Sequence, residues 1–214
     1  GTLKLEHNSS IPSEFALLRV GMNSINPGEK LTINMGQLVI EGKTNSSSGF
    51  TGIDLDGYSL GDESKTHDDI TVNCDAVIKM ENTVGTARGV YVQGHYGTKT
   101  SENFKNITID VAGNKEAQGI RILSGELDGY ASNNLMNIDG NASIKTLSTA
   151  GNSFALSTKI GAGSNKINFM GTTRLDSISK NKSAYGIYSV ADLTADNTMN
   201  FADDTLILVE AHGQ

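Results

Sequence analysis

The sequence predicts an all-β fold, a parallel β-helix (β-solenoid) of about six rungs with three short strands per rung. Two recurring elements favour this fold: a short strand pattern centred on an asparagine, and a glycine-led segment that precedes it. The composition agrees, with 24 Gly, 2 Pro and no Trp in 214 residues. Apolar residues make up 37%, below the roughly 45–50% of an average globular domain. Such a chain suits many short strands joined by turns.

The strand pattern places an Asn, or once an Asp, between two apolar residues, as in Ile33–Asn34–Met35. In a period-two strand both apolar neighbours point one way and the polar side chain points the other way. The steps between successive markers are 39, 37, 27, 31 and 32 residues, and a period of about 33 is typical of solenoids and other repeat folds. The markers are Asn34, Asn73, Asp110, Asn137, Asn168 and Asn200.

Stacking of the rungs about 4.8 Å apart would bring these markers into one file. The file is either a ladder in which each side-chain amide bonds to the next rung, or a solvated outer row, and both roles are structural. Asp110 fits the file as a single carboxylate among amides. The flanking apolar residues are expected to form two inward files, one of them Ile33, Val72, Ile109, Met136, Ile167 and Met199, the other Met35, Cys74, Val111, Ile138, Phe169 and Phe201.

The glycine-led segments read as Gly followed by apolar, polar and apolar residues, the pattern of a half-buried strand entered through a corner that a Cβ would obstruct. Four copies are Thr51–Leu55, Arg88–Val92, Gln118–Ile122 and Tyr185–Ser189. A third recurring element begins at Ala76–Met80 and completes a three-strand rung. We expect one solenoid domain over residues 1–214, in which residues 1–30 form a first partial rung.

Charge and cysteine content exclude several function classes. Net charge is −7 and the Lys and Arg residues are scattered, so nucleic acid is not expected as a partner. No apolar run reaches the ~18–20 residues of a membrane span, so this segment is not expected to insert into a membrane. The one cysteine, Cys74, occupies an apolar slot and is expected to be a buried thiol.

Neither a cofactor nor a metal site is predicted. The four histidines are widely separated, without the spacing of a metal-binding pair. The acidic stretch from Asp54 to Glu63 lacks the ligand spacing of an EF-hand loop. It is therefore expected to be a solvated loop.

No catalytic residues are predicted, because the carboxylates do not recur as pairs on adjacent rungs. A carbohydrate-active β-helix enzyme, such as a polysaccharide lyase or a tailspike-like hydrolase, remains the alternative. Candidate binding residues are the aromatic and histidine side chains of predicted inter-strand loops, namely Tyr58, His95, Tyr96 and Tyr130. The loops that fail to repeat, Tyr58–Asp69 and His95–Asn106, are the expected place of recognition.

The segment Ser183–Val190 followed by Leu193–Phe201 resembles the passenger regions of Gram-negative autotransporters, which include pertactin-like and haemagglutinin-like β-helices. The resemblance implies a right-handed β-helix, at the cell surface or secreted, as part of a longer passenger. It also implies an adhesin or a self-association segment whose partner is a host glycan or protein, extracellular matrix, or a sister-cell passenger. A structural stalk without a ligand is a third possibility.

Self-association is also expected at an edge. Leu206–Ile207–Leu208–Val209 forms a last apolar strand without an evident cap. An unpaired strand edge offers N–H and C=O groups to another chain.

Overall fold

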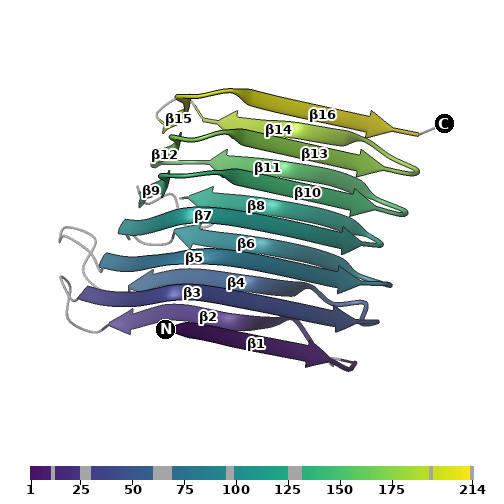
Figure 1. The fold of residues 1–214 in the computed structure, drawn as a ribbon, viewed down its shortest axis with the longest axis horizontal. Coiled ribbons are helices and arrows are strands. Elements are labelled where there is room, and N and C mark those ends of the chain that lie inside the picture. The colour runs from purple at the N-terminus through teal and green to yellow at the C-terminus, as the bar shows by residue number, and fades with distance from the viewer. Residues whose placement is uncertain are drawn as a thin grey trace.

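A computed structural model describes residues 1–10, 13–24, 30–59, 69–94, 99–124, 132–192 and 195–212. Sixteen strands form a parallel β-solenoid, and the described residues contain no helix (Figure 1). The predicted all-β parallel solenoid is therefore confirmed.

The strands belong to two sheets. The ten-stranded sheet contains β1 (Thr2–Asn8), β3 (Lys30–Thr44), β5 (Asp69–Asn82), β7 (Lys99–Gly113), β9 (Ser132–Ile138), β10 (Ala142–Ser148), β12 (Gly163–Phe169), β13 (Thr173–Ser179), β15 (Ala195–Phe201) and β16 (Thr205–Ala211). The six-stranded sheet contains β2 (Phe15–Ser24), β4 (Phe50–Ser59), β6 (Thr86–Gly94), β8 (Glu116–Ser124), β11 (Asn152–Ile160) and β14 (Ala184–Ala191).

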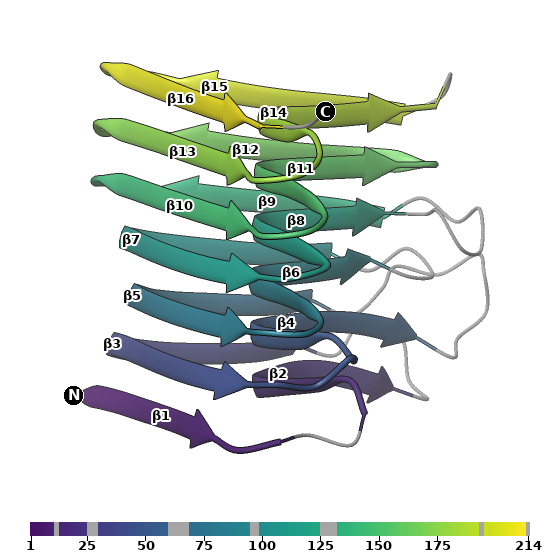
Figure 2. The same cartoon turned by 90° about the vertical axis from the view of Figure 1, so that its right-hand side faces the viewer.

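Each strand pairs in parallel with the equivalent strand of the next rung, so the chain alternates between the sheets as it climbs (Figure 2). Along one path the order is β1-β3-β5-β7-β10-β13-β16, and along the other it is β2-β4-β6-β8-β11-β14. The long strands β3 and β5 shift register between Asn34 and Gln37 and between Cys74 and Ala76. Later rungs divide the same path into two strands, such as β9 and β10. The predicted three-strand rung is thus most distinct in the later half of the chain.

The core lies between the two sheets. Its largest fully buried side chains include Phe50, Phe104 and Phe169, and Phe169 stacks on Phe201 with ring centroids 4.9 Å apart. Each fully buried apolar side chain of this size contributes about 1.5–3 kcal/mol relative to an exposed one. Because the strands share one register, every rung adds such side chains to a continuous interior.

A column of small residues makes the predicted corner of the six-stranded sheet. It runs Gly52, Gly89, Gly119, Ala155 and Gly186, and the strand pairing skips these positions. A Cβ on Gly119 would lie 2.4 Å from the carbonyl oxygen of Ala155 and 2.4 Å from Cγ2 of Ile144 on the facing sheet. The column is therefore a bend at which the chain closely approaches both its neighbouring rung and the opposite sheet, and the pairing keeps the same register on both sides of it.

The prediction that Asp110 is the third marker is wrong. Asp110 pairs with Lys79, a position of the third recurring element, whereas Asn103 pairs with Asn73. The inward neighbours of this marker are accordingly Glu102 and Phe104 instead of Ile109 and Val111. With Asn103 the steps become 39, 30, 34, 31 and 32, which is more even than the predicted series.

Candidate functional site

The asparagine ladder consists of Asn34, Asn73, Asn103, Asn137, Asn168 and Asn200. Each Nδ2 donates to Oδ1 of the asparagine one rung below, at 2.7–2.9 Å. A groove of about 790 Å³ runs beside its lower rungs, lined also by Asp75, Lys105 and Asp139. Each inner ladder amide uses one N–H and one oxygen lone pair, and its main role is to fix the register of the rungs.

The predicted aromatic loop site is mostly outside the described residues, which exclude His95, Tyr96 and Tyr130. Tyr58 lies within strand β4, where its backbone pairs with that of Asn23. The loop expected over His95–Asn106 is wrong from Lys99 onward, because β7 begins there. Asn103, inside that stretch, is a ladder residue.

The thiol of Cys74 is unsuited to nucleophilic chemistry. It is 5% exposed, and burial together with the Asp75 carboxylate raises its pKa to about 11. A thiol needs a lowered pKa to react as a thiolate at neutral pH. The prediction of a buried apolar cysteine agrees with this environment.

The described residues contain no cluster of three or more His, Cys, Asp or Glu side chains able to hold a metal ion. They also contain no helix long and apolar enough to span a membrane.

One buried acid is absent from the sequence prediction. Glu102 on β7 is fully buried, and neither carboxylate oxygen has a hydrogen-bond partner of good geometry. It occupies the inward file between Val72 and Met136. Loss of hydration raises its pKa to about 8, against a smaller opposing effect of the nearby Thr100 hydroxyl group. The carboxyl group is therefore protonated and neutral at neutral pH.

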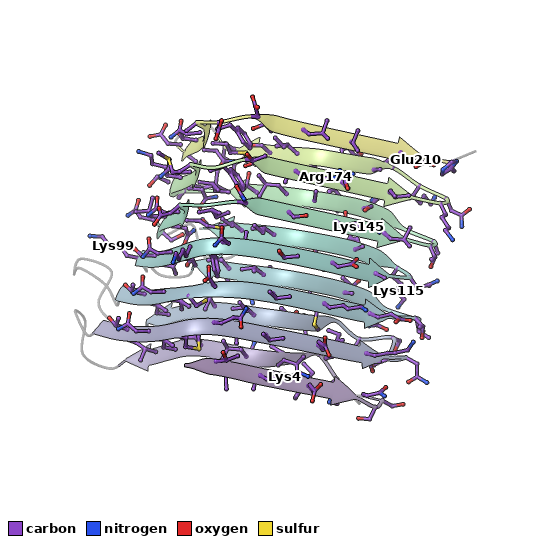
Figure 3. The ribbon with its side chains drawn as sticks, viewed as in Figure 1. Lys4, Lys99, Lys115, Lys145, Arg174 and Glu210 are labelled. Atoms are coloured by element: carbon purple, nitrogen blue, oxygen red, sulfur yellow. The ribbon has the colours of Figure 1, made fainter. Side chains whose placement is uncertain are left out.

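The outer face of the ten-stranded sheet carries an alternating charge pattern. Lys79, Asp110, Lys145 and Asp176 occupy one register position on β5, β7, β10 and β13. We call these four residues the lysine–aspartate column. Lys79, Asp110 and Lys145 are exposed, while Asp176 is half-buried and accepts from Nε of Arg174 at 2.8 Å. Figure 3 shows Lys145 and Arg174 on this face, with Lys4 and Glu210 toward its two ends.

The charges of the column do not pair with one another. In the part of the chain that the structure describes, no ion pair within 4.0 Å joins Lys79, Asp110 and Lys145. Flanking positions do pair: Lys43 lies 3.0 Å from Glu81, and Lys4 lies 2.7 Å from Glu6. The column therefore leaves charged groups available to a partner.

A shallow pocket lies on the same face at its lower rungs. Its volume is about 520 Å³, and its lining includes Glu41, Lys43, Lys79 and Glu81. Both signs of charge line it, so it is a mixed polar surface without a preference for one ionic ligand.

The outer face of the six-stranded sheet has a different chemistry. Two register columns run along it, Arg88, Gln118, Phe154 and Tyr185 in one and Tyr91, Arg121, Ser157 and Tyr188 in the other. We call these eight residues the arginine–tyrosine strip. Residues three apart on a regular strand face opposite sides. The bend at the glycine column, where one residue of each strand is left out of the pairing, brings the two columns to the same side.

Contacts within the strip confirm that the two columns meet. The Arg88 guanidinium lies over the Tyr91 ring, 4.8 Å from its centroid. Phe154 stacks on Tyr185 at 5.0 Å, and Tyr188 meets both rings edge-on at 5.5 and 5.2 Å. Tyr188 is 39% exposed, so part of this aromatic cluster reaches solvent.

Each arginine of this face lies beside a carboxylate. Arg19 Nη2 is 2.9 Å from Asp54, Arg88 contacts Glu14, and Arg121 Nη1 is 3.9 Å from Glu116. Gln118 accepts from Nε of Arg88 at 3.1 Å. The face thus offers donors, acceptors and aromatic rings together, and each of its guanidinium groups has a carboxylate beside it.

The strand edge predicted for self-association is exposed. Leu206, Ile207, Leu208 and Val209 of β16 have 42–51% exposure, and β16 pairs only with β13 among the described strands. The pattern of an apolar, half-paired strand agrees with the expectation from the sequence.

Comparison with models of protein families, with curated proteins and with solved structures found no match.

Proposed function

We propose that this chain is a self-associating segment of a cell-surface β-solenoid, in the manner that its resemblance to autotransporter passengers suggests. Two copies would adhere through the outer face of the ten-stranded sheet. The observation that carries the proposal is the strict alternation of charge in the lysine–aspartate column.

The four charges of the lysine–aspartate column are complementary to their own reverse, while Glu41, one rung below Lys79 in the same register position, would face Leu208 of the second copy. If a second copy is related by a two-fold axis parallel to the strands, midway between the rungs of Asp110 and Lys145, the order of rungs is inverted across the interface. Lys79 then faces Asp176 of the second copy, and Asp110 faces its Lys145. All four positions meet an opposite charge, as an isologous interface requires.

One end of a neighbouring column is compatible with the same position of the two-fold axis. Lys43 on β3 and Glu210 on β16 occupy one register column of the path β1-β3-β5-β7-β10-β13-β16. The two-fold axis lies midway between β7 and β10, so it brings β3 opposite β16 of the second copy and Lys43 opposite Glu210. In the same column Glu81 would face Ile178 and Ala112 would face Leu147, so the one charged pair of this column lies at the ends of the interface. Apolar contacts surrounded by complementary charge are typical of specific interfaces.

The size of the face indicates a weak contact. Strands of seven residues on about seven rungs cover roughly 700 Å² per copy, near the ~800 Å² per partner of a standard interface. Exposed ion pairs contribute about 0–1 kcal/mol each. Many copies on opposed surfaces would add such weak contacts into strong adhesion.

Sedimentation equilibrium of the chain tests the proposal. We expect a reversible dimer that dissociates as salt is raised toward about 0.5 M, because screening shortens the range of exposed charges. Asp110→Lys and Lys145→Asp should each be monomeric, since each variant places like charges opposite one another twice.

An equimolar mixture of the two variants is the decisive sample. In the mixed dimer the two introduced side chains, the lysine at position 110 and the aspartate at position 145, face each other. The original Lys145 of one variant likewise faces the original Asp110 of the other, so the dimer should return. A dimer that survives either variant alone would indicate pairing through another surface, such as the β16 edge. A mixture that stays monomeric would also contradict the proposal.

A further inference from the structure

We infer that the arginine–tyrosine strip is a binding site for a neutral oligosaccharide. It lies on the outer side of the six-stranded sheet, and the lysine–aspartate column lies on the outer side of the sheet that faces it across the core. The two sites would therefore act independently.

The aromatic cluster supplies the first element of recognition. Sugar rings have a face of C–H groups that packs against aromatic rings, and tyrosine combines such a ring with a polar hydroxyl group. Tyr188 is exposed, and its ring is held in place by Phe154 and Tyr185. A ring that is already ordered loses little conformational freedom when it binds a ligand.

The small residue in the column supplies the second element. Ser157 lies between Arg121 and Tyr188 on consecutive strands. Rungs are about 4.8 Å apart, so a long side chain and an aromatic ring flank a short hydroxyl side chain. Ser157 is itself only 5% exposed, so its small size leaves room above it and the Arg121 guanidinium, 28% exposed in its side chain, is the polar group of this column that can reach a sugar chain stacked on Tyr188.

The charge balance decides the class of sugar. Each arginine of the strip has a carboxylate beside it, Glu14 for Arg88 and Glu116 for Arg121. A guanidinium can only donate and a carboxylate can only accept, whereas each sugar hydroxyl group does both. Paired groups of this kind suit hydroxyl groups and give no net attraction to a uronic acid or to a sulfated sugar.

The strip also favours a sugar chain over a polypeptide. Its polar groups are side chains in two columns that run along the solenoid axis, and the strands β6, β8 and β11 that carry Arg88, Arg121 and Ser157 are paired on both sides. Tyr188 lies on β14, which pairs only with β11 among the described strands, so a peptide strand added there would reach the aromatic cluster but not the other rungs of the strip. An extended peptide gains its affinity chiefly from backbone hydrogen bonds at a free strand edge. A linear glycan, in contrast, can follow the columns from rung to rung.

The experiment is a screen of the intact chain against immobilised neutral and acidic oligosaccharides, with titration calorimetry on the sugars retained. The protein is kept at a concentration where it is monomeric, so failure of self-association leaves the result unchanged. We expect Tyr188→Ala to weaken binding of a neutral sugar about tenfold or more and Tyr188→Phe to change it by less than about threefold.

Two controls separate the site from the fold. Ser143→Ala, at an exposed position on the opposite outer face, should bind the sugar as the unsubstituted chain does. Thermal unfolding of Tyr188→Ala should show that the solenoid is intact, and Arg121→Gln provides a second reduction of binding if it is not. Retention of acidic sugars only, of no sugar, or of a sugar unaffected by Tyr188→Ala and Arg121→Gln would overturn the inference. Cleavage of a retained sugar would overturn it as well, since the proposed site binds without turnover.

Discussion

The two outer sheet faces of this solenoid differ in the charges at their centres, although both also carry ion pairs, such as Lys43–Glu81 and Arg88–Glu14. On the ten-stranded sheet, Lys79, Asp110 and Lys145 stand apart and exposed. On the six-stranded sheet, Arg88 is 17% exposed in its side chain and already contacts Glu14, Gln118 and Tyr91. Charges that do not pair within their own face suit recognition of a charged surface, whereas charges neutralised within the face suit a neutral ligand.

The backbone explains this difference. The six-stranded sheet bends at its glycine column, where one residue of each strand is left out of the pairing, and this bend turns two rows of side chains toward each other. In the ten-stranded sheet the strands β10 and β13 alternate regularly, so their rows stay separate. The register shifts of β3 and β5 lie away from the lysine–aspartate column, at Asn34 to Gln37 and at Cys74 to Ala76. One local irregularity, repeated on each rung, therefore gives the two faces different chemistries.

The largest expected loss of stability comes from adding a side chain at the glycine column. Gly119→Val adds a branched side chain where a Cβ alone would lie 2.4 Å from a backbone oxygen. We expect a loss of about 3 kcal/mol or more, measured as the free energy of unfolding in urea.

Ala155 provides the matched control, since it occupies the same column and already has a Cβ. Ala155→Gly should cost about 1 kcal/mol or less. Equal losses in the two variants would show that close approach at the column is not what shapes the six-stranded sheet.

Much of this fold is accessible from the sequence, because its signals repeat. The alternation around Asn34, Asn73, Asn137, Asn168 and Asn200 correctly indicates one stacked file. The glycine-led segments indicate a corner that excludes a Cβ, and the structure has that corner. A period that recurs on every rung averages out local exceptions.

The errors arise where a single rung departs from the pattern. Glu102 stands at an inward position next to Asn103, so this stretch lacks the apolar neighbour that marks the other copies. Asp110, between Ile109 and Val111, matches the pattern better, which explains the wrong prediction.

The arginine–tyrosine strip escapes prediction for another reason. Its residues are visible at each glycine, as in Arg88–Gly89–Val90–Tyr91 and Tyr185–Gly186–Ile187–Tyr188. Strict period-two reasoning puts the first and fourth residues on opposite faces. Only the bend at the glycine column brings these residues to one side, and the alternation of apolar and polar residues along a strand does not indicate where such a bend lies.

The second largest effect is expected at Glu102, on the inner side of the ten-stranded sheet. Its folded pKa of about 8 lies above the ordinary value of 4.5. Between these values the folded chain holds a proton that the unfolded chain has lost, so stability falls as pH rises from about 4.5 to about 8. Below this window the group has no effect on the pH dependence.

Glu102→Met matches the Met136 that follows it in the file. In the variant, stability should no longer fall over this pH range because of residue 102, and its melting temperature at pH 8 should exceed that of the unsubstituted chain. Calorimetry from about pH 5 to about pH 8 measures both. Glu81→Met, on the outer side of β5, should keep the slope. A slope unchanged in Glu102→Met would mean that the carboxyl group ionises in the folded chain without cost.

The comparison between the two faces also predicts that removing a charged side chain costs more stability on the six-stranded sheet than on the ten-stranded sheet. Arg88→Ala removes a guanidinium that is mostly buried and has three partners, so we expect a loss of about 2 kcal/mol. Lys145→Ala removes an exposed ammonium group and should change stability by less than about 0.5 kcal/mol. Urea unfolding gives the free energy of unfolding of both variants. Similar losses would show that the contacts of Arg88 stabilise the fold no more than the exposed ammonium group of Lys145 does.

The finest comparison is within the asparagine ladder, between an inner and an end residue. Asn137 donates to Asn103 and accepts from Asn168, both at 2.8 Å, whereas Asn34 at the lower end only accepts, from Asn73 at 2.7 Å. A partly exposed hydrogen bond contributes about 0.5–1.5 kcal/mol net. Asn137→Ala should therefore cost about twice as much as Asn34→Ala, and urea unfolding of the two variants provides the ratio. If the two losses are equal, the inner amides gain nothing from having two neighbours, and the ladder sets the register of the rungs without adding stability to each of them.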